Sequence, residues 1–289
     1  MTPLVEAAPA KVNLSLNILG RRADGYHALD SLVVFAKAGD RLTLAPGGPL
    51  SLRVRGATAE QAGPIEDNLV IKAARALADE IPGLKLGRFM LDKRLPVAAG
   101  LGGGSSDAAA ALRLLARVNR LALDDARLRR VARKTGADVP VCLDPRPRRM
   151  RGIGEVLSAP LALQPLAAVL INPGVAVPTK DVFAILGLKP GGGIRRAGRP
   201  RALPSERGAL IAALAAERND LEPAAITLQP VIASVLAGLR KQPGCDLARM
   251  SGSGATCFGL FTSARAARAA AHDLAARHRR WWVKATTFG

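Results

Sequence analysis

The sequence predicts an α+β fold in two domains, with mainly antiparallel sheets. Segments of alternating hydrophobicity, typical of strands, and segments with helical spacing follow one another in irregular order, and the chain has no internal repeat. With 289 residues, of which 49% are hydrophobic, the chain is long enough to build two cores. We place the domains at residues 1–160 and 161–289.

The first half begins with strands. In residues 10–18 (AKVNLSLNI) apolar and polar side chains alternate, so Lys11 and Asn13 share the polar face of a half-buried strand. Asp24-Gly25 predicts a turn. We expect two strands within residues 29–45, then a helix at 67–81 with one apolar stripe, and then a strand at 86–95.

Glycines and then helix formers follow. Ser105 or Ser106 can cap a helix that has Asp107 in its first turn, where a carboxylate favours the helix dipole. A second helix is expected from Asp124 to Gly136, a residue suited to a left-handed C-terminal position.

The second half alternates in the same irregular way. Strands are predicted at 166–172, 245–250, 255–262 and 281–287, and helices at 179–187, 207–216, 220–240 and 263–280, the last of them basic.

The charge is strongly positive. Lys and Arg number 42 against 23 Asp and Glu, for a net charge of +19, which favours phosphorylated or polyanionic partners. The arginines are scattered, however, and one Tyr, two Trp and six Phe supply few stacking platforms for nucleic acid. We therefore expect a solvated basic surface that attracts small phosphorylated substrates, and no nucleic acid as the main partner. Residues 189–204 (KPGGGIRRAGRPRALP) predict a flexible loop.

Cysteine usage favours a reducing, cytoplasmic location. Cys142, Cys245 and Cys257 are odd in number and far apart, so they predict neither a disulfide framework nor a CxxC metal site. The N-terminus has no basic segment before an apolar core, and no apolar stretch of about 18 residues occurs. We expect neither export nor a membrane partner.

The segment PVAAGLGGGSSDAAAAL (residues 96–112) predicts an anion site. A strand that ends in glycines and continues into a helix surrounds a turn with unpaired backbone N–H groups. The segment is not a P-loop, because Ser105 rather than lysine follows Gly104. The GxGxxG spacing of dinucleotide-binding proteins and protein kinases also fails, since its third glycine would fall on Ser105 or Asp107.

The form of this segment resembles the phosphate-binding motif of the GHMP kinases, named for galactokinase, homoserine kinase, mevalonate kinase and phosphomevalonate kinase. The matching positions are Pro96, Gly100-Leu101-Gly102, Ser105-Ser106 and Ala108-Ala109. The long variant GLGGGSSDAA is similar to one branch, which phosphorylates the 2-hydroxyl of 4-diphosphocytidyl-2-C-methyl-D-erythritol in the non-mevalonate isoprenoid pathway. Further blocks similar to this branch lie at 9–29, 67–69, 93–96, 136–141, 152–155, 172–179, 219–220 and 251–256.

The resemblance implies a ribosomal-protein-S5-like ATP-binding domain followed by a ferredoxin-like α/β-plait domain. It also implies a catalytic pair. Asp138 would accept the proton of the substrate hydroxyl as it attacks the γ-phosphorus of ATP, and Lys11 would hold that carboxylate and lower the pKa of the hydroxyl.

ATP with Mg²⁺ is the implied phosphoryl donor, and the metal ligands are left unassigned. Asn68, Leu69 and Lys93 would lie near adenosine, and the turn at Gly252-Ser253-Gly254 would close on the substrate phosphates. The residues expected to wrap the ATP phosphates are Pro96, Val97, Ala98, Ala99, Gly100, Leu101, Gly102, Gly103, Gly104, Ser105 and Ser106.

The substrate residues implied by the resemblance begin with Asn13, at the methylerythritol end. Tyr26 would stack on cytosine, His27 would form a hydrogen bond with it, and Phe183 would cover its opposite face. Thr179, four residues before Phe183, belongs to the same substrate-binding segment.

Three alternatives stay open beside this cytidyl-diphosphate kinase: a GHMP kinase or decarboxylase for another small alcohol, a non-catalytic binding protein on the same fold, and a nucleic-acid binder. The Tyr26-His27 pair argues against the first, and the presence of both Lys11 and Asp138 argues against the second. Residues 144–151 and 189–204 are more basic or more variable than the family pattern, so local loop structure and the oligomeric state, a monomer or a weak homodimer, do not follow from it.

Overall fold

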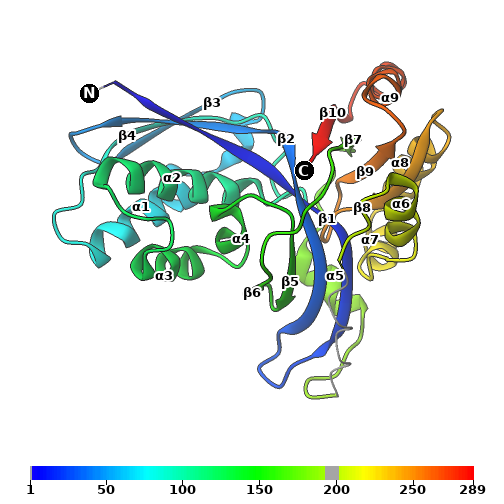
Figure 1. The fold of residues 1–289 in the computed structure, drawn as a ribbon, viewed down its shortest axis with the longest axis horizontal. Helices are drawn as coiled ribbons and strands as arrows, with labels where there is room; N and C mark the ends of the chain where they lie inside the picture. The colour runs from blue at the N-terminus through cyan, green and yellow to red at the C-terminus, as the bar shows by residue number, and fades with distance from the viewer. Residues whose placement is uncertain (1, 193–201) are drawn as a thin grey trace. The chain divides into compact units, whose positions relative to one another are not determined.

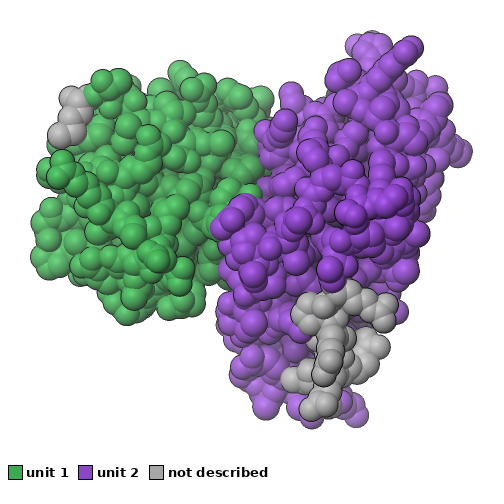
Figure 2. Space-filling model, viewed as in Figure 1, with its two compact units in different colours: residues 1–11, 39–97, 102–145 green, residues 12–38, 98–101, 146–289 purple. Residues whose placement is uncertain are grey.

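A computed structural model of the chain describes residues 2–192 and 202–289. The residues group into two compact units (Figure 2). Unit 1 comprises Met1–Lys11, Gly39–Val97 and Gly102–Pro145, and unit 2 comprises Val12–Ala38, Ala98–Leu101 and Arg146–Gly289. The two long strands β1 (Leu4–Arg21) and β2 (His27–Pro46) contribute residues to both units. The division into domains at 1–160 and 161–289 stays a prediction.

Unit 1 combines strands with a group of helices. β4 (Gly87–Asp92) pairs in parallel with β3 (Ser51–Arg55) and antiparallel with residues 41–46 of β2. Helix α2 packs against α1, α3 and α4 (Figure 1). The helices are α1 (Leu69–Glu80), α2 (Gly103–Asn119), α3 (Ala126–Thr135) and α4 (Val139–Leu143), with short 3-10 turns at Ala59–Ala62 and Ile65–Asp67.

Small side chains allow these helices to approach closely. Ala108–Ala111 of α2 are fully buried, together with Leu112. Asn68 caps α1 by accepting a hydrogen bond from the Val70 N–H at 3.0 Å, which satisfies one of the unpaired amides at the start of the helix. The glycine segment therefore continues into a rigidly packed helix.

Unit 2 contains an antiparallel sheet with the strand order β10-β7-β9-β8. β10 also meets β2 at Phe288 and Ala36, and β5 pairs with residues 29–33 of β2 and with β6. The strands are β5 (Arg148–Gly152), β6 (Val156–Leu157), β7 (Leu166–Asn172), β8 (Cys245–Met250), β9 (Cys257–Phe261) and β10 (Trp282–Phe288). The helices are α5 (Thr179–Ile185), α6 (Arg207–Ala215), α7 (Glu222–Leu228), α8 (Val231–Arg240) and α9 (Ala264–Arg277).

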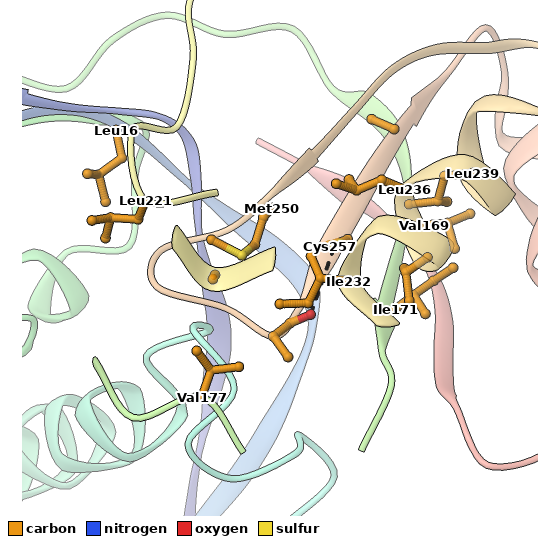
Figure 3. Packing of buried hydrophobic residues seen from close by; sticks show 14 of the residues in the cluster. Leu16, Val169, Ile171, Val177, Leu221, Ile232, Leu236, Leu239, Met250 and Cys257 are labelled. Carbon is orange, nitrogen blue, oxygen red and sulfur yellow. Dashed lines mark hydrogen bonds between the residues drawn. The ribbon is translucent and has the colours of Figure 1, made fainter. Parts of the chain in front are cut away.

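The core of unit 2 forms where helices cover this sheet. Figure 3 shows Val169 and Ile171 of β7 and Met250 of β8 near Ile232 and Leu236 of α8. These side chains are almost fully buried, and burial of each contributes about 1.5–3 kcal/mol relative to exposure. The core thus fixes the strand ends from which several candidate site residues project.

Several predicted elements are confirmed within a few residues, among them the strands at 166–172 and 245–250 and the helices at 67–81 and 207–216. The prediction of two strands within residues 29–45 is wrong, since they form the single strand β2. Gly39 lies within this strand. A Cβ there would lie 2.4 Å from Ala8 O, so glycine permits close passage of another strand.

Other expectations also need correction. Residues 220–240 form two helices, α7 and α8, because Pro230 lacks an amide proton and stands between them as the N-cap of α8. Gly136 follows α3 with an extended backbone (φ 172°), not a left-handed one. Strands β3 and β5 and helix α4 are not among the elements predicted from the sequence.

Within residues 2–192 and 202–289, none of the helices combines the length and the hydropathy that a bilayer crossing requires. Of the loop expected at 189–204, residues 193–201 lie outside the described part of the chain.

Candidate active site

Lys11 and Asp138 form an ion pair in unit 1. The distance from Lys11 Nζ to Asp138 Oδ2 is 2.9 Å, and the two side chains are 7% and 32% exposed. Asp138 is the N-cap residue of α4, but its side chain forms no capping hydrogen bond. A buried ammonium therefore holds a partly exposed carboxylate, which is the arrangement expected of a base that must reach a ligand.

Gly102 lies against this pair. Its φ of 59° is in the left-handed region, and a Cβ there would lie 3.2 Å from Lys11 Cε and 3.8 Å from Asp138 Oδ2. Gly102 is also the N-cap of α2, so no side chain caps the first amides of that helix. Uncapped amides at a helix N-terminus bind anions, and here they begin beside Lys11.

The two serines of the motif differ in their surroundings. Neither caps α2, because the helix begins at Gly103 and both lie inside its first turn. Ser106 is completely buried, and its hydroxyl donates to Pro9 O at 2.8 Å. Ser105 is half-buried, so it is the serine whose hydroxyl can reach a ligand.

Lys93 belongs to a buried cluster of three charged side chains. Its Nζ donates to Asp40 Oδ2 at 2.5 Å and to Asp107 Oδ2 at 2.8 Å. Burial alone would lower the pKa of Lys93, but the charges of Asp107 and Asp40 outweigh it and raise the pKa. The predicted place of Asp107 in the first turn, facing the helix dipole, is wrong: Asp107 points into the unit and binds Lys93.

The residues expected near adenosine border the same helix end. A Cβ on Gly104 would lie 3.5 Å from Leu69 Cδ1, and one on Gly103 would lie 3.5 Å from Lys93 Nζ. Asn68, the neighbour of Leu69, already uses its side-chain oxygen to cap α1. Asn68, Leu69 and Lys93 thus lie near the start of α2, with the Lys93 ammonium buried.

The remaining loop residues vary in exposure. Pro96 is half-buried and Val97 and Ala98 are exposed, whereas the side chains of Ala99 and Leu101 are buried. Residues 98–101 belong to unit 2, where Thr256 N–H donates to Ala99 O at 3.2 Å. Because the side chains of Ala99 and Leu101 are buried, these two residues can contact a ligand only through their backbone atoms.

Asn13 in unit 2 has a fixed orientation. Ser31 Oγ donates to Ser15 O at 2.6 Å, so it must accept from Asn13 Nδ2, which lies 2.7 Å away. The amide oxygen of Asn13 then faces Gly252, where a Cβ would lie 3.4 Å from it. Asn13 therefore presents its carbonyl oxygen on that side.

Ser251 joins the glycine segment to the turn between β8 and β9. Its hydroxyl accepts from the Asn13 N–H at 3.1 Å and donates to Gly100 O at 3.0 Å. Gly100 and Gly252 both have positive φ values, and a Cβ on Gly100 would lie 2.5 Å from Ser251 O. The predicted turn at 252–254 therefore packs directly on the Gly100 backbone and beside Asn13.

The residues expected to recognise a base lie at the start of β2 and on α5. The His27 and Phe183 rings stack with centroids 4.5 Å apart and an interplanar angle of 27°. Burial, together with the positive charge of Arg21, lowers the pKa of His27 and so favours the neutral ring. His27 Nε2 is buried and has no hydrogen-bond partner within residues 2–192 and 202–289, and Tyr26 is 61% exposed.

Thr179 lies at the N-terminus of α5. Its Oγ1 is 2.8 Å from Ser253 Oγ, so it is tied to the turn that also contacts Gly100 and Asn13. Unit 2 thus brings together Asn13, Gly100, Thr179 and Ser253 through hydrogen bonds and close backbone contacts.

The acidic residues give little support for a metal held by protein alone. Among the described residues no three His, Cys, Asp or Glu side chains are grouped closely enough to bind a metal ion. A divalent ion at the start of α2 would take most of its ligands from nucleotide phosphates and water, as Mg²⁺ commonly does.

Sequence reasoning missed four residues of the site. Asp40 and Ser31 lie in β2, far along the chain from the motif, and nothing in their spacing distinguishes them from other strand residues. Asp107 and Ser251 lie within recognised motifs, but their contacts depend on Lys93 and Gly100, which only the fold places beside them.

Both parts of the chain match family models. Residues 68–144 match the GHMP kinases N terminal domain, and residues 201–279 match the GHMP kinases C terminal domain. The chain belongs to the GHMP kinases and has their two-domain α+β fold.

Its relatives include proteins of one named kind. The chain is 61% identical to the 4-diphosphocytidyl-2-C-methyl-D-erythritol kinase of Methylobacterium radiotolerans, with 99% of each chain covered. It is 59% identical to the protein of that name from Xanthobacter autotrophicus, with 96% of this chain and 97% of the relative covered. A crystal structure of 4-(cytidine 5'-diphospho)-2C-methyl-D-erythritol kinase is 36% identical, with a TM-score of 0.78 and 99% of each chain covered. Homoserine kinase from Cytophaga hutchinsonii, at 20% identity and a TM-score of 0.70, shares the fold.

Proposed function

We propose that the protein transfers the γ-phosphoryl group of ATP to the 2-hydroxyl of 4-diphosphocytidyl-2-C-methyl-D-erythritol. The observation that carries this proposal is the Lys11–Asp138 pair, 2.9 Å apart and packed against Gly102 at the uncapped start of α2. The names of relatives with 55–61% identity over nearly the whole chain support the choice of substrate.

Asp138 is the base. Its carboxylate takes the proton of the substrate hydroxyl while the hydroxyl oxygen bonds to the γ-phosphorus and the bond from that phosphorus to the β–γ bridging oxygen breaks. ADP leaves with the electron pair of that bond. The Lys11 ammonium orients the carboxylate and stabilises negative charge on the attacking oxygen, so the residues contribute positioning and charge rather than a covalent intermediate.

The start of α2 holds the phosphates. Its first amides are uncapped, and glycine at 102–104 removes the side chains that would keep phosphate oxygens at a distance. The half-buried Ser105 adds a hydroxyl. Mg²⁺ bound with ATP would supply neutralisation of phosphate charge, and Ser105 is the described side chain at the start of α2 whose hydroxyl could help to hold it.

Several side chains of unit 2 have the chemistry to recognise parts of the substrate. The Asn13 amide oxygen, fixed by Ser31, accepts a hydrogen bond from the methylerythritol end. The neutral His27 ring, the exposed Tyr26 ring and Phe183 supply aromatic surface and a ring nitrogen for cytosine. The three thiols are all free, which fits a reducing compartment such as the cytoplasm, and we expect a monomer or a weak homodimer.

The test is ADP release with Mg-ATP and 4-diphosphocytidyl-2-C-methyl-D-erythritol, run beside homoserine, mevalonate and no-acceptor controls. The proposal predicts ADP only with the cytidyl substrate, with phosphorus NMR locating the new phosphate on the 2-oxygen. Turnover with another acceptor alone would leave a GHMP kinase with a different substrate. No turnover with any acceptor would favour a binding protein.

A further inference from the structure

The cluster behind the start of α2 holds two carboxylates and only one ammonium. The side chains of Lys93, Asp40 and Asp107 are 5%, 0% and 3% exposed. If both acids were ionised, the cluster would carry one uncompensated negative charge away from water, which is costly in a protein interior.

Asp40 is fully paired. Oδ2 accepts from Lys93 Nζ, and Oδ1 accepts from the N–H groups of Arg94 and Leu95 at 2.6 and 2.8 Å. These bonds also fix the backbone that leads into the glycine segment. Asp40 therefore accepts a hydrogen bond at each of these contacts. It is the carboxylate whose negative charge compensates the positive charge of Lys93.

Asp107 is paired on one side only. Its Oδ2 accepts from Lys93 Nζ at 2.8 Å, whereas its Oδ1 is buried and has no hydrogen-bond partner among the residues that the structure describes. Burial, with the negative charge of Asp40 adding to it, raises the pKa of Asp107 to about 7 in spite of Lys93. A proton on Asp107 makes the cluster neutral.

The cluster lies directly behind the first residue of α2. A Cβ on Gly103 would lie 3.5 Å from Lys93 Nζ and 3.7 Å from Asp40 Oδ2. Asp107 is on the same helix, one turn further along. A negative charge on Asp107 would therefore oppose an anion at the N-terminus of α2, since charges in the interior are poorly screened.

Lys93 and Asp40 are the charged side chains that act most strongly on Asp107, and Lys11, Asp138 and Arg113 are charged groups near its neighbour Cys142. Cys142 on α4 is also buried, which raises the pKa of its thiol to about 12 and keeps it neutral. Helix α1 turns apolar residues inward, and α3 does the same. These buried side chains are Val70, Ile71, Ala73, Ala74 and Leu77 on α1 and Leu128, Val131 and Ala132 on α3.

We propose that Asp107 is a positioning residue that takes up a proton from solvent when nucleotide phosphate binds at the start of α2, so that the Lys93–Asp40–Asp107 cluster is neutral in the nucleotide complex. The inference rests on the proposed function for the site of the phosphates. The proton goes to the carboxylate of Asp107, and no bond other than this O–H forms or breaks.

The experiment is calorimetric titration of Mg-ADP into the wild-type protein, Asp107→Asn and Asp125→Asn, in two buffers of different ionisation enthalpy between about pH 6 and about pH 8. Asp107→Asn mimics the protonated acid. Asp125→Asn removes the same formal charge at the N-cap of α3, where Arg127 lowers the pKa of the acid to about 2, and asparagine still caps the helix.

The wild-type protein and Asp125→Asn are expected to take up protons on binding and to lose about tenfold in affinity across this range, one decade for each pKa unit by which binding shifts the acid. Asp107→Asn is expected to lose this uptake and to bind more tightly than wild type at the upper pH. Equal proton uptake in wild type and Asp107→Asn would overturn the role of Asp107 while leaving nucleotide binding intact. Absence of Mg-ADP binding by wild type would instead contradict the proposed function and with it this inference.

Infrared difference spectra of the wild-type protein give a second readout that does not depend on the folding of a variant. Addition of Mg-ADP at the upper pH is expected to increase the absorbance of protonated carboxyl groups. A spectrum without that increase would contradict proton uptake by a buried acid.

Discussion

Gly102 and Lys11 are in contact so close that a methyl group at position 102 would lie 3.2 Å from Lys11 Cε. Gly102, the N-cap of α2, and Lys11, which holds Asp138, are therefore parts of one packed site. In the proposed mechanism this contact places the phosphate-binding amides beside the base.

Gly102→Ala should reduce kcat by at least about tenfold, because the left-handed backbone costs about 1 kcal/mol with alanine and the new methyl group displaces Lys11. ADP release under saturating substrates measures the effect. Gly83→Ala is the matched control, since Gly83 also has a positive φ (78°) but nothing within 4 Å of its would-be Cβ. An equal loss of kcat in both variants would show that backbone strain alone is responsible.

The two motif serines should separate into a structural and a ligand-binding residue. Ser106→Ala should lower the free energy of unfolding by about 1 kcal/mol, because it removes the hydroxyl that donates to the half-buried Pro9 carbonyl. Ser105→Ala should instead raise KM for ATP with little change in denaturant midpoint. Urea unfolding and steady-state kinetics on both variants test this pair, and the reverse assignment would contradict the geometry.

Ser31→Ala should raise KM for the cytidyl substrate by about tenfold, because the Asn13 amide loses the acceptor that fixes its orientation. KM for ATP should hardly change. Ser31→Thr retains the hydroxyl and should restore most of the affinity. If alanine and threonine behave alike, the hydroxyl does not orient Asn13.

Asp107 should make the protein less stable as pH rises. Its pKa is raised on folding from 3.8 to about 7, so the folded state binds a proton that the unfolded chain releases, and stability is lost between about pH 4 and about pH 7. The denaturation temperature of Asp107→Asn minus that of wild type should therefore be larger at pH 8 than at pH 5. Thermal unfolding at the two pH values measures this difference, and a constant difference would contradict the raised pKa.

Local pattern and motif predicted much of the fold and the central residues of the site. The alternation in residues 10–18 correctly predicts a strand that carries Lys11 and Asn13, and the matching blocks predicted that Asp138 pairs with Lys11. The strand depends on residues that are neighbours in the sequence, and the pair belongs to motifs whose residues have a fixed chemical role, so both could be predicted without the fold.

What the sequence left out depends on contacts between distant segments. Residues 29–45 are expected to form two strands but form part of β2 alone, and Gly39 lies inside it, where its missing side chain lets the Ala8 carbonyl approach. Asp107 has the position of a dipole-favouring acid, yet the buried Lys93 draws it inward. Ser31 is an ordinary strand residue until the fold places Asn13 against it. In each case a tertiary contact overrides the local preference.

The most direct test of the catalytic pair is the rate of ADP formation by Asp138→Asn with Mg-ATP and the cytidyl substrate at saturation. Asparagine keeps the size of the side chain but cannot accept the hydroxyl proton, so kcat should fall by about 10²–10⁴-fold while nucleotide binding and the circular dichroism spectrum stay unchanged. A folded variant that retains kcat within about threefold of wild type would contradict the assignment of Asp138 as the base.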